Sequence, residues 1–255
     1  SYAVFCLKKG PTGAATFAGA LVGREAEWAQ LEKILERVLA GEGHVLRLVG
    51  GTGVGKSHLA AEFAVEAIRR GAQAYMGICQ SVSHDIAYYA WRSIFRDLLG
   101  LPESAPGKDA AAANALQIAQ LEATLDQIEP AWKIRLPLLG DLLGLPIPDN
   151  ATTAAFDPRL RQDALFALAV ELIQAHCAHL DAPYTHLDAP YTHLDAPYTH
   201  TRAPYAHTRA PYARTRAPLL LILEDAHWMD EASMGLTLAL GRVIAPSPVL
   251  LILVH

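Results

Sequence analysis

The sequence predicts an α/β fold of three layers, in which helices cover both faces of a mostly parallel sheet. Three observations predict it. Residues 44–49 form a short apolar, β-branched run, which a glycine-rich loop and then helical periodicity follow. A second apolar run, residues 218–223, ends in two acids. Long helical patterns separate the two runs. Strands that read as continuous apolar runs are typical of parallel sheets, because they are buried on both faces.

Composition limits the classes of function. The chain has 255 residues, a formal net charge of -5 and 52% hydrophobic residues. This is a globular profile without a broad basic surface, so we expect no direct nucleic-acid binding. The apolar runs are too short to span a bilayer, so we expect no membrane partner. Cys6, Cys79 and Cys177 are widely spaced and form neither a metal pattern nor a disulfide framework, which favours a cytoplasmic location.

The two ends of the chain suggest a fragment of a longer protein. Residues 1–20 are interpreted as a linker or as the end of a preceding domain, with a short strand possible at Tyr2–Leu7. The first residue is Ser1, and the last residues form an apolar strand with no turn signal after it. We therefore expect a domain at residues 21–255 that is incomplete at its C-terminus.

A helix is expected to open near Glu25 and to run to about Ala40. Its start is acidic, which suits the helix dipole. The apolar positions that would form its buried face are Trp28, Leu31, Leu35, Val38 and Leu39. Glycines at 41 and 43 end the helix and lead into the strand at residues 44–49. Taken alone, Arg24 would be a solvated surface charge.

The glycine-rich loop is the central motif of the chain. Its residues fit G-x-x-x-x-G-K-[ST], the phosphate-binding P-loop, and are Gly50, Gly51, Thr52, Gly53, Val54, Gly55, Lys56 and Ser57. Glycines let the backbone turn so that N–H groups converge on a phosphate, and the next helix adds its unpaired donors. Lys56 supplies a positive charge for the β- and γ-phosphates, and Ser57 offers a hydroxyl to Mg²⁺.

A chance glycine-rich turn is the alternative to a P-loop. The flanking pattern disfavours it, because a strand precedes the loop and helical spacing follows it at Leu59, Phe63, Ala67 and Ile68. We therefore predict nucleotide binding. His58, which directly follows the motif, is included among the candidate nucleotide contacts.

The region after the P-loop helix reads as a strand at residues 72–79 and then as a helical insertion at residues 85–178. One helical stripe comprises Ile86, Tyr89, Ala90, Ile94, Phe95 and Leu98. A further helix is predicted at residues 110–128. Another begins near Pro158, a residue that suits a first helical turn, and carries Leu160, Leu165, Leu168, Leu172 and Ile173. The insertion contains no catalytic constellation.

A seven-residue repeat occupies residues 179–218, beginning with His179-Leu180-Asp181-Ala182-Pro183-Tyr184-Thr185. The proline in each repeat excludes a coiled coil. Regular histidines suggest metal binding, but no carboxylate or thiolate geometry supports it. We favour a tandem expansion within a tolerated surface loop, extended or disordered, which costs little because loop-closure entropy grows slowly with length.

The second half of the site is predicted where the apolar run at residues 218–223 ends in Glu224 and Asp225, the Walker B pattern. Two acids at the carboxyl end of a buried strand can hold Mg²⁺ and polarise an attacking water. By position we assign Glu224 to Mg²⁺ and Asp225 to the water, and the reverse assignment stays open. Asp230 is interpreted as the cap of a helix at residues 231–243. His227 and Trp228 are expected to pack beneath the site or to fix the loop.

Three segments together resemble the STAND class of P-loop ATPases, which are relatives of AAA+ proteins. They are Leu21-Val22-Gly23-Arg24-Glu25, residues 50–57 and residues 221–230. The resemblance implies ATP and Mg²⁺ as cofactors, with Val22 and Arg24 among the nucleotide contacts. It also implies that the Walker B strand lies beside the P-loop strand, and that residues 249–254 lead to a sensor position. The repeat at residues 179–218 departs from the family pattern.

Two functions remain open. The first is an ATP-hydrolysing switch domain of a larger signalling or transcription-regulatory protein, of the kind fused to nucleotide cyclases, Ser/Thr kinases or LuxR-type regulators. The second is a nucleotide-binding scaffold with little or no turnover. The expected partners are ATP and ADP, other domains of the same polypeptide and, through nucleotide-dependent self-association, further copies of the chain.

Overall fold

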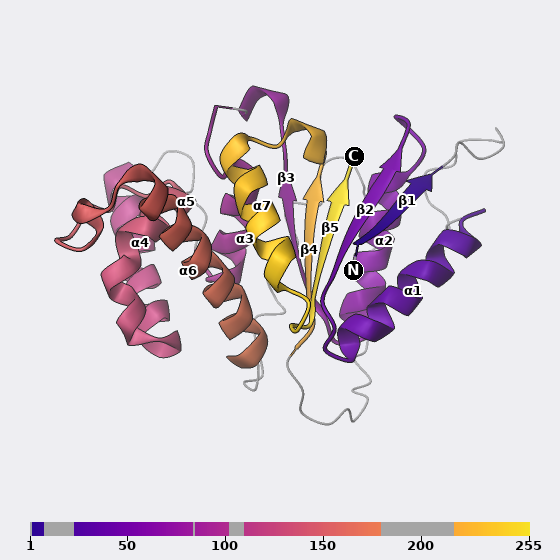
Figure 1. The fold of residues 1–255 in the computed structure, drawn as a ribbon, viewed down its shortest axis with the longest axis horizontal. Coiled ribbons are helices and arrows are strands. Elements are labelled where there is room, and N and C mark those ends of the chain that lie inside the picture. Colours follow the sequence, from indigo (N-terminus) through magenta and orange to yellow (C-terminus); the bar gives the residue numbers. More distant parts are fainter. Residues whose placement is uncertain (1, 8–22, 84, 102–109, 180–216) are drawn as a thin grey trace.

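A computed structural model describes residues 2–7, 23–83, 85–101, 110–179 and 217–255 of the chain. In these ranges, five strands form one parallel sheet in the order β1-β2-β5-β4-β3 (Figure 1). The strands are β1 (Tyr2–Leu7), β2 (His44–Gly50), β3 (Gln73–Ile78), β4 (Leu219–Glu224) and β5 (Val249–Val254). The fold is therefore a mixed α/β fold with a parallel sheet, consistent with a P-loop NTPase, as the sequence predicted.

Helices cover both faces of the sheet. Those described are α1 (Glu25–Leu39), α2 (Lys56–Arg69), α3 (Tyr89–Leu98), α4 (Ala110–Ile128), α5 (Leu136–Leu143), α6 (Pro158–His179) and α7 (Glu231–Val243). In Figure 1, α1 and α2 lie on one side of the strands, whereas α3, α6 and α7 lie on the other. Helices α4 and α5 lie beyond this second layer. The arrangement confirms the three-layer prediction.

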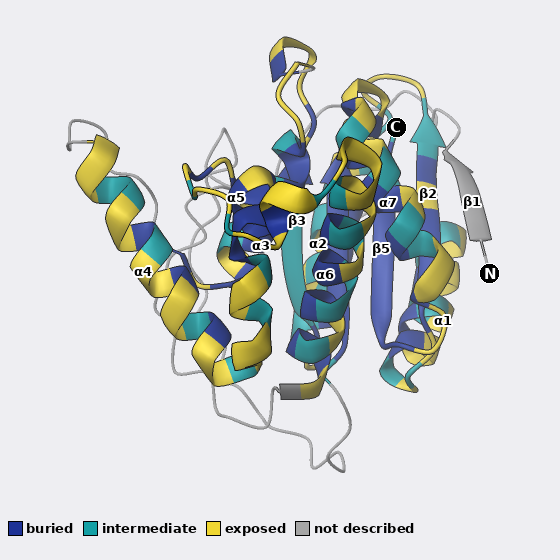
Figure 2. Ribbon diagram, turned by 60° about the vertical axis from the view of Figure 1, so that its left-hand side comes forward, coloured by how far each residue is buried: buried dark blue, intermediate teal, exposed yellow. Residues whose placement is uncertain are grey.

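Alternate residues of the central strands pack into two separate cores. On β4, Leu220 and Ile222 belong to the core under α1 and α2, whereas Leu219, Leu221 and Leu223 belong to the core on the opposite face. Because successive side chains of a strand point to opposite faces, a strand covered on both sides must be apolar at every position. Figure 2 shows the result: β5 is buried along nearly its whole length, and the helices are exposed on their outer faces.

The strand order corrects one expectation. The Walker B strand β4 does not lie beside the P-loop strand β2, because β5 pairs with both of them. Ile252 of β5 stands opposite Leu46 on one side and Ile222 on the other. The physical reason is that Val249–Val254 is wholly apolar and nearly all buried, which suits the middle of a sheet covered on both faces.

Strand β1 is part of the same sheet. It pairs in parallel with β2, with Tyr2 opposite Val45 and Leu7 opposite Gly50. The short strand considered at Tyr2–Leu7 is present, but its interpretation as part of a linker or of a preceding domain did not foresee that pairing. The remainder of residues 1–20 lies outside the described ranges.

The insertion between β3 and β4 contains α3 to α6, in agreement with the predicted helical character. Helix α4 has the predicted bounds, and α6 begins at Pro158 as expected. Two apolar positions were misassigned: Ile86 precedes α3 and is 40% exposed, and Leu160 is 49% exposed. Helix α3 begins only at Tyr89 because Tyr88 adopts a left-handed conformation that no helix can continue. Of the repeat predicted at residues 179–218, residues 180–216 lie outside the described ranges.

Candidate functional site

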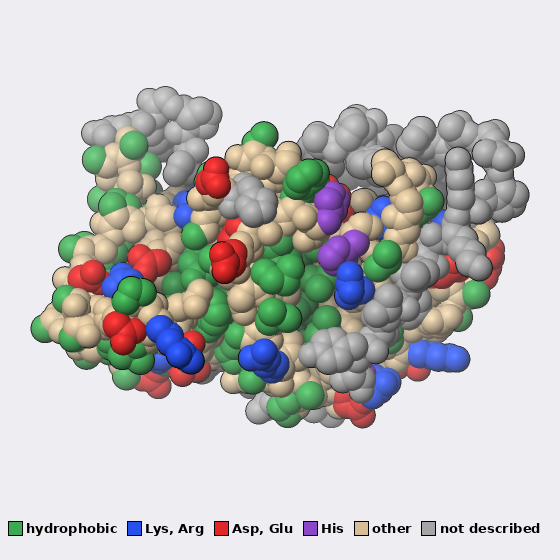
Figure 3. All heavy atoms as spheres, turned by 45° about the horizontal axis from the view of Figure 1, so that its top comes forward, with side chains coloured by type: hydrophobic (Ala, Val, Ile, Leu, Met, Phe, Trp, Pro, Cys, Tyr) green, Lys and Arg blue, Asp and Glu red, His purple; other side chains and the backbone are tan. Residues whose placement is uncertain are grey.

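The P-loop and the Walker B acids meet at one edge of the sheet. The P-loop joins β2 to α2, and Glu224 ends β4. Because all five strands are parallel, their carboxyl ends lie along the same edge, where ligands bind in open α/β sheets. Figure 3 turns this edge toward the viewer and shows histidine side chains next to acidic and basic ones, beside a broad apolar area.

The P-loop backbone takes conformations that only glycine adopts easily. Gly53 has φ +77 and Gly55 has φ +86, both in the left-handed region. Gly55 is also the N-cap residue that directly precedes α2, and no side chain caps this end of the helix. The first N–H groups of α2 are therefore left to bind an anion, which the helix dipole favours.

Lys56 folds back over its own loop. Its Nζ donates hydrogen bonds to the carbonyl oxygens of Gly50 and Gly51, each at 3.0 Å. These contacts keep the amine at the mouth of the loop, where phosphates would lie. Binding a phosphate would exchange two neutral acceptors for charged ones, which form the stronger hydrogen bonds.

Arg24 lies against the P-loop and is not a solvated surface charge. Its Nη2 donates to the carbonyl of Val54 at 2.9 Å, and its Nη1 pairs with Glu27 at 3.0 Å. The side chain thus ties the start of α1 to the tip of the loop. His58 is half-buried in the first turn of α2, and Val22 lies outside the described residues.

One hydrogen bond joins the two halves of the site. Ser57 Oγ donates to Glu224 Oε2 at 2.8 Å, across 167 positions of sequence. Glu224 is only 7% exposed, and its other oxygen, Oε1, is buried with no hydrogen-bond partner among the described residues. Burial raises the pKa of Glu224, and the charge of Asp225 adds to the shift, whereas Ser57 and Lys56 oppose it.

These groups fit a magnesium ion. Mg²⁺ prefers oxygen ligands and is usually held by one or two protein groups together with phosphate oxygens and waters. Ser57 and Glu224 supply a hydroxyl and a carboxylate in contact with each other. A buried carboxylate oxygen without a partner is costly in an empty site, whereas a cation beside it would compensate that cost.

Asp225, His227 and Trp228 are exposed, whereas Ala226 between them is buried. Asp225 has φ 52, again in the left-handed region, and leads from β4 into a 3-10 turn at Ala226–Trp228. The rings of His227 and Trp228 lie 5.1 Å apart, and both side chains are exposed. Of the two alternatives, packing beneath the site is therefore wrong, because the turn places both side chains on the surface; a role in fixing the loop stays a prediction.

Asp230 caps α7, as predicted, but its contacts extend further. It accepts a hydrogen bond from the backbone N–H of Ser233 at 2.8 Å. It also accepts from the N–H groups of Tyr88 and Tyr89, at 3.1 and 3.3 Å. No sequence signal indicated this second role, because the two tyrosines lie more than 140 positions earlier in the chain.

Cys79 lies beside the site, but its thiol is unreactive. The residue directly follows β3, and its N–H donates to the carbonyl of Glu224 at 2.9 Å. Burial raises the pKa of the Cys79 thiol to about 12, with further contributions from the charges of Asp230, Asp225 and Glu224. The thiol therefore stays protonated and contributes no nucleophile to the site.

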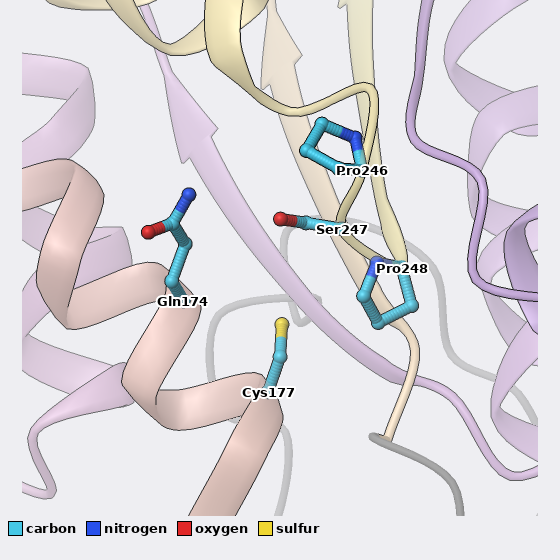
Figure 4. Close-up of a pocket in the computed structure, with 5 residues that line it drawn as sticks. All are labelled: Gln174, Cys177, Pro246, Ser247 and Pro248. Atoms are coloured by element: carbon cyan, nitrogen blue, oxygen red, sulfur yellow. The ribbon is translucent and has the colours of Figure 1, made fainter.

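A separate cavity lies at the opposite edge of the sheet. It has a volume of about 300 Å³ and lies between α6 and the segment that precedes β5 (Figure 4). Its lining residues are Gln174, Cys177, Pro246, Ser247 and Pro248. Pro248 immediately precedes β5, whereas the P-loop follows the carboxyl end of β2, so the cavity is not part of the nucleotide site.

Two further findings bear on the class of protein. Among the helices of the described ranges, none is long and apolar enough to cross a membrane. In those same ranges, no group of three or more His, Cys, Asp or Glu side chains is placed to hold a metal ion by itself. A magnesium ion at Ser57 and Glu224 would take its further ligands from phosphate oxygens and waters.

Comparisons with known proteins identify the family. The model of the AAA ATPase domain matches residues 20–252, which include α1, the P-loop, the insertion and the Walker B strand. A search of curated proteins and a search of solved structures found no match. The family match spans most of the chain and agrees with the parallel sheet and with the Ser57–Glu224 contact at its carboxyl edge. The chain belongs to the AAA ATPase domain family.

Proposed function

We propose that this domain binds Mg·ATP and hydrolyses it as a switch within a larger signalling or transcription-regulatory protein. The hydrogen bond between Ser57 and Glu224 carries the proposal. It brings the last residue of the P-loop motif to the Walker B strand, and it leaves one buried carboxylate oxygen of Glu224 without a partner. Such an arrangement is suited to a cation that bridges protein and phosphate oxygens.

Different described residues bind different parts of Mg·ATP in this proposal. The N–H groups of the P-loop and of the first turn of α2 bind the β-phosphate, and Lys56 turns from its loop carbonyls toward the β- and γ-phosphates. Arg24 holds the tip of the loop through Val54, next to the nucleotide. Ser57 and Glu224 would hold Mg²⁺, which would supply positive charge next to the phosphates.

The two Walker B acids take different roles in this proposal. Glu224 is buried against Ser57, so it is assigned to the metal. Asp225 is exposed at the same edge, so it is assigned to orient the attacking water. The opposite assignment predicts different kinetics, as described below.

Substitution of Lys56 tests the binding step. Lys56→Ala removes a charge-assisted contact worth about 1.5–3 kcal/mol, so Mg·ATP affinity should fall at least tenfold in a calorimetric titration. Lys33→Ala, which removes an exposed lysine from α1, is the matched control and should bind normally. Equal affinity of Lys56→Ala and wild type would overturn the P-loop assignment.

Single-turnover hydrolysis tests the two acids. Asp225→Asn should bind Mg·ATP but hydrolyse it about 10²–10⁴-fold more slowly, the usual contribution of a general base. Glu224→Gln should instead raise the Mg²⁺ concentration needed for half-maximal rate. Normal hydrolysis by Asp225→Asn, together with loss of hydrolysis in Glu224→Gln, would reverse the assignment. Absence of turnover in the wild-type chain with its partner domains present would favour a nucleotide-binding scaffold.

A further inference from the structure

Asp230 is a buried carboxylate whose two oxygens each accept two hydrogen bonds. Oδ1 accepts from the N–H groups of Ser233 and Tyr88, at 2.8 and 3.1 Å. Oδ2 accepts from the Ser233 hydroxyl at 2.6 Å and from the Tyr89 N–H at 3.3 Å. Asp230 is 5% exposed, and no basic side chain in the described ranges forms an ion pair with it. Its charge is therefore compensated by neutral donors, by two helix N-termini and by electrostatic attraction to Arg92.

A helix cap needs only one of these contacts. The bond from the Ser233 N–H caps α7, whereas the bonds from Tyr88 and Tyr89 join α7 to the first residues of α3. We call this contact between α3 and α7 the joint. Trp91 Nε1 of α3 adds to it by donating to the carbonyl of Ser233 at 3.2 Å and to Thr237 Oγ1 at 3.1 Å. The start of the helical insertion is thus bonded to the end of the Walker B loop, residues 225–230, which connects β4 to α7.

Backbone strain occurs on both sides of this joint. In the described ranges, the non-glycine residues with positive φ are Tyr88, at 60, and Asp225, at 52. A left-handed conformation costs a non-glycine residue roughly 1–2 kcal/mol and persists only where neighbouring contacts enforce it. Tyr88 is held directly by Asp230. Asp225 begins the loop that Asp230 ends, and the bond from the Trp228 N–H to the Asp225 carbonyl, at 2.8 Å, keeps that loop tight.

We propose that Asp230 is a positioning residue for the ATPase reaction. It fixes the far end of the Walker B loop, so that Asp225 keeps its place beside Glu224, and it transmits changes at the nucleotide to α3 and the helical insertion. Asp230 itself contacts neither nucleotide nor metal. The inference rests on the proposed function, because it assigns a structural support to the water-orienting acid of that site.

Asp230→Ser separates the cap from the joint. Serine is a good helix cap, so α7 should keep its first turn. Its single, shorter hydroxyl does not replace a carboxylate that accepts from two helices at once. We expect kcat for Mg·ATP hydrolysis to fall about 10- to 100-fold, with KM unchanged within about threefold, because misplacement of a catalytic group costs rate without costing ground-state binding.

Hydrogen exchange provides a readout that a simple cap would not change. The amides of Tyr88 and Tyr89 should exchange faster in Asp230→Ser than in wild type. In wild type, ATP should change the exchange rates of the α3 amides, and this change should disappear in Asp230→Ser. Asp157→Ser is the matched control. Asp157 caps α6 through the Leu160 N–H at 2.8 Å, is exposed and joins no second helix, so this variant should hydrolyse ATP normally.

The outcomes distinguish this inference from the proposed function. Turnover and α3 exchange in Asp230→Ser that match those of Asp157→Ser would reduce Asp230 to an ordinary cap and overturn the inference alone. A wild-type chain that binds no Mg·ATP would overturn the proposed function and this inference with it. If Asp230→Ser does not fold, Asp230→Asn, which keeps the side-chain shape and one acceptor oxygen, should show the same loss of kcat at constant KM.

Discussion

Glu224 and Asp230 are two buried carboxylates on one short stretch of chain, and their hydrogen bonding differs sharply. Asp230 accepts four hydrogen bonds, from Ser233, Tyr88 and Tyr89. Glu224 accepts one, from Ser57, and its second oxygen has no partner among the described residues. Both residues are less than a tenth exposed: Asp230 is 5% exposed and Glu224 is 7% exposed. Burial alone therefore does not distinguish their roles.

The contrast shows what each carboxylate contributes. A buried polar group whose hydrogen bonds are all made stabilises the fold, whereas one with an unmet bond costs stability unless a ligand compensates it. Asp230 belongs to the first kind and fastens two helices. Glu224 belongs to the second kind, which is why we assign it to the metal. Loss of the Asp230 carboxylate should therefore lower the free energy of unfolding, whereas neutralising Glu224 should raise it in the absence of ligand.

The largest expected effect is the loss of Asp230. Asp230→Ala removes the bond from the Ser233 N–H that caps α7, worth about 1 kcal/mol. It also leaves the buried N–H of Tyr88 unpaired, at about 1–3 kcal/mol, and the part-buried N–H of Tyr89, at about 1 kcal/mol. We expect the free energy of unfolding, measured in urea, to fall by about 3–5 kcal/mol. Asp157→Ala, at an exposed cap, should cost only about 1 kcal/mol. Equal losses in the two variants would contradict the joint between α3 and α7.

A histidine must be accounted for before acid titration can compare the two carboxylates. His176 Nε2 lies 2.6 Å from Gln73 Oε1, between α6 and β3. Burial lowers the pKa of His176 from 6.5 to about 4. A folded pKa below the unfolded one means that stability is complete above about pH 6.5 and is lost as pH falls toward 4. At 1.36 kcal/mol per pKa unit, the loss is about 3 kcal/mol.

His176→Gln isolates that contribution. Because glutamine does not titrate, the variant should lose much less stability than wild type between pH 6.5 and pH 4 in urea unfolding. Parallel pH profiles of the two proteins would show that His176 is not the acid-sensitive group. The variant is also the proper background for titrating the carboxylates.

Some of this comparison was predictable from sequence and some was not. The P-loop, the apolar strand at Leu219–Glu224 and the cap at Asp230 each depend on local residue types at fixed spacing, so they were predicted. The position of β5 between β2 and β4 was not, because strand neighbours depend on how helical connections cross the sheet.

The joint at Tyr88 shows most clearly what cannot be predicted from the local sequence. Tyrosine is uncommon in the left-handed region, so nothing in the local sequence indicates that Tyr88 takes φ 60 and stops the helix there. The conformation is enforced by Asp230, which is remote in sequence. Likewise, Arg24 alone reads as a surface charge, and only the folded chain places it on the carbonyl of Val54. Contacts of this kind are tertiary and leave no local pattern.

The smallest expected effect is also the sharpest test of the comparison. Glu224→Gln keeps an acceptor for the Ser57 hydroxyl but removes the buried charge. The folded pKa of Glu224 is raised above its ordinary value by burial, so its contribution to stability is complete below pH 4.5 and is lost as pH rises through the folded pKa. Without ligand, Glu224→Gln should therefore be more stable than wild type at pH 7, by about 1 kcal/mol, with the gap closing toward pH 4.5.

Ligand should reverse that order. Mg·ATP at a concentration far above its Kd stabilises any protein that binds it only when folded, and the ionised carboxylate of Glu224 is the group assigned to the metal. Wild type should then become the more stable of the two at pH 7, while Lys33→Ala follows wild type in both conditions. Thermal unfolding with and without Mg·ATP measures this reversal. If Glu224→Gln is less stable than wild type even without ligand, Glu224 supports the fold in the same way as Asp230, and the distinction between the two carboxylates fails.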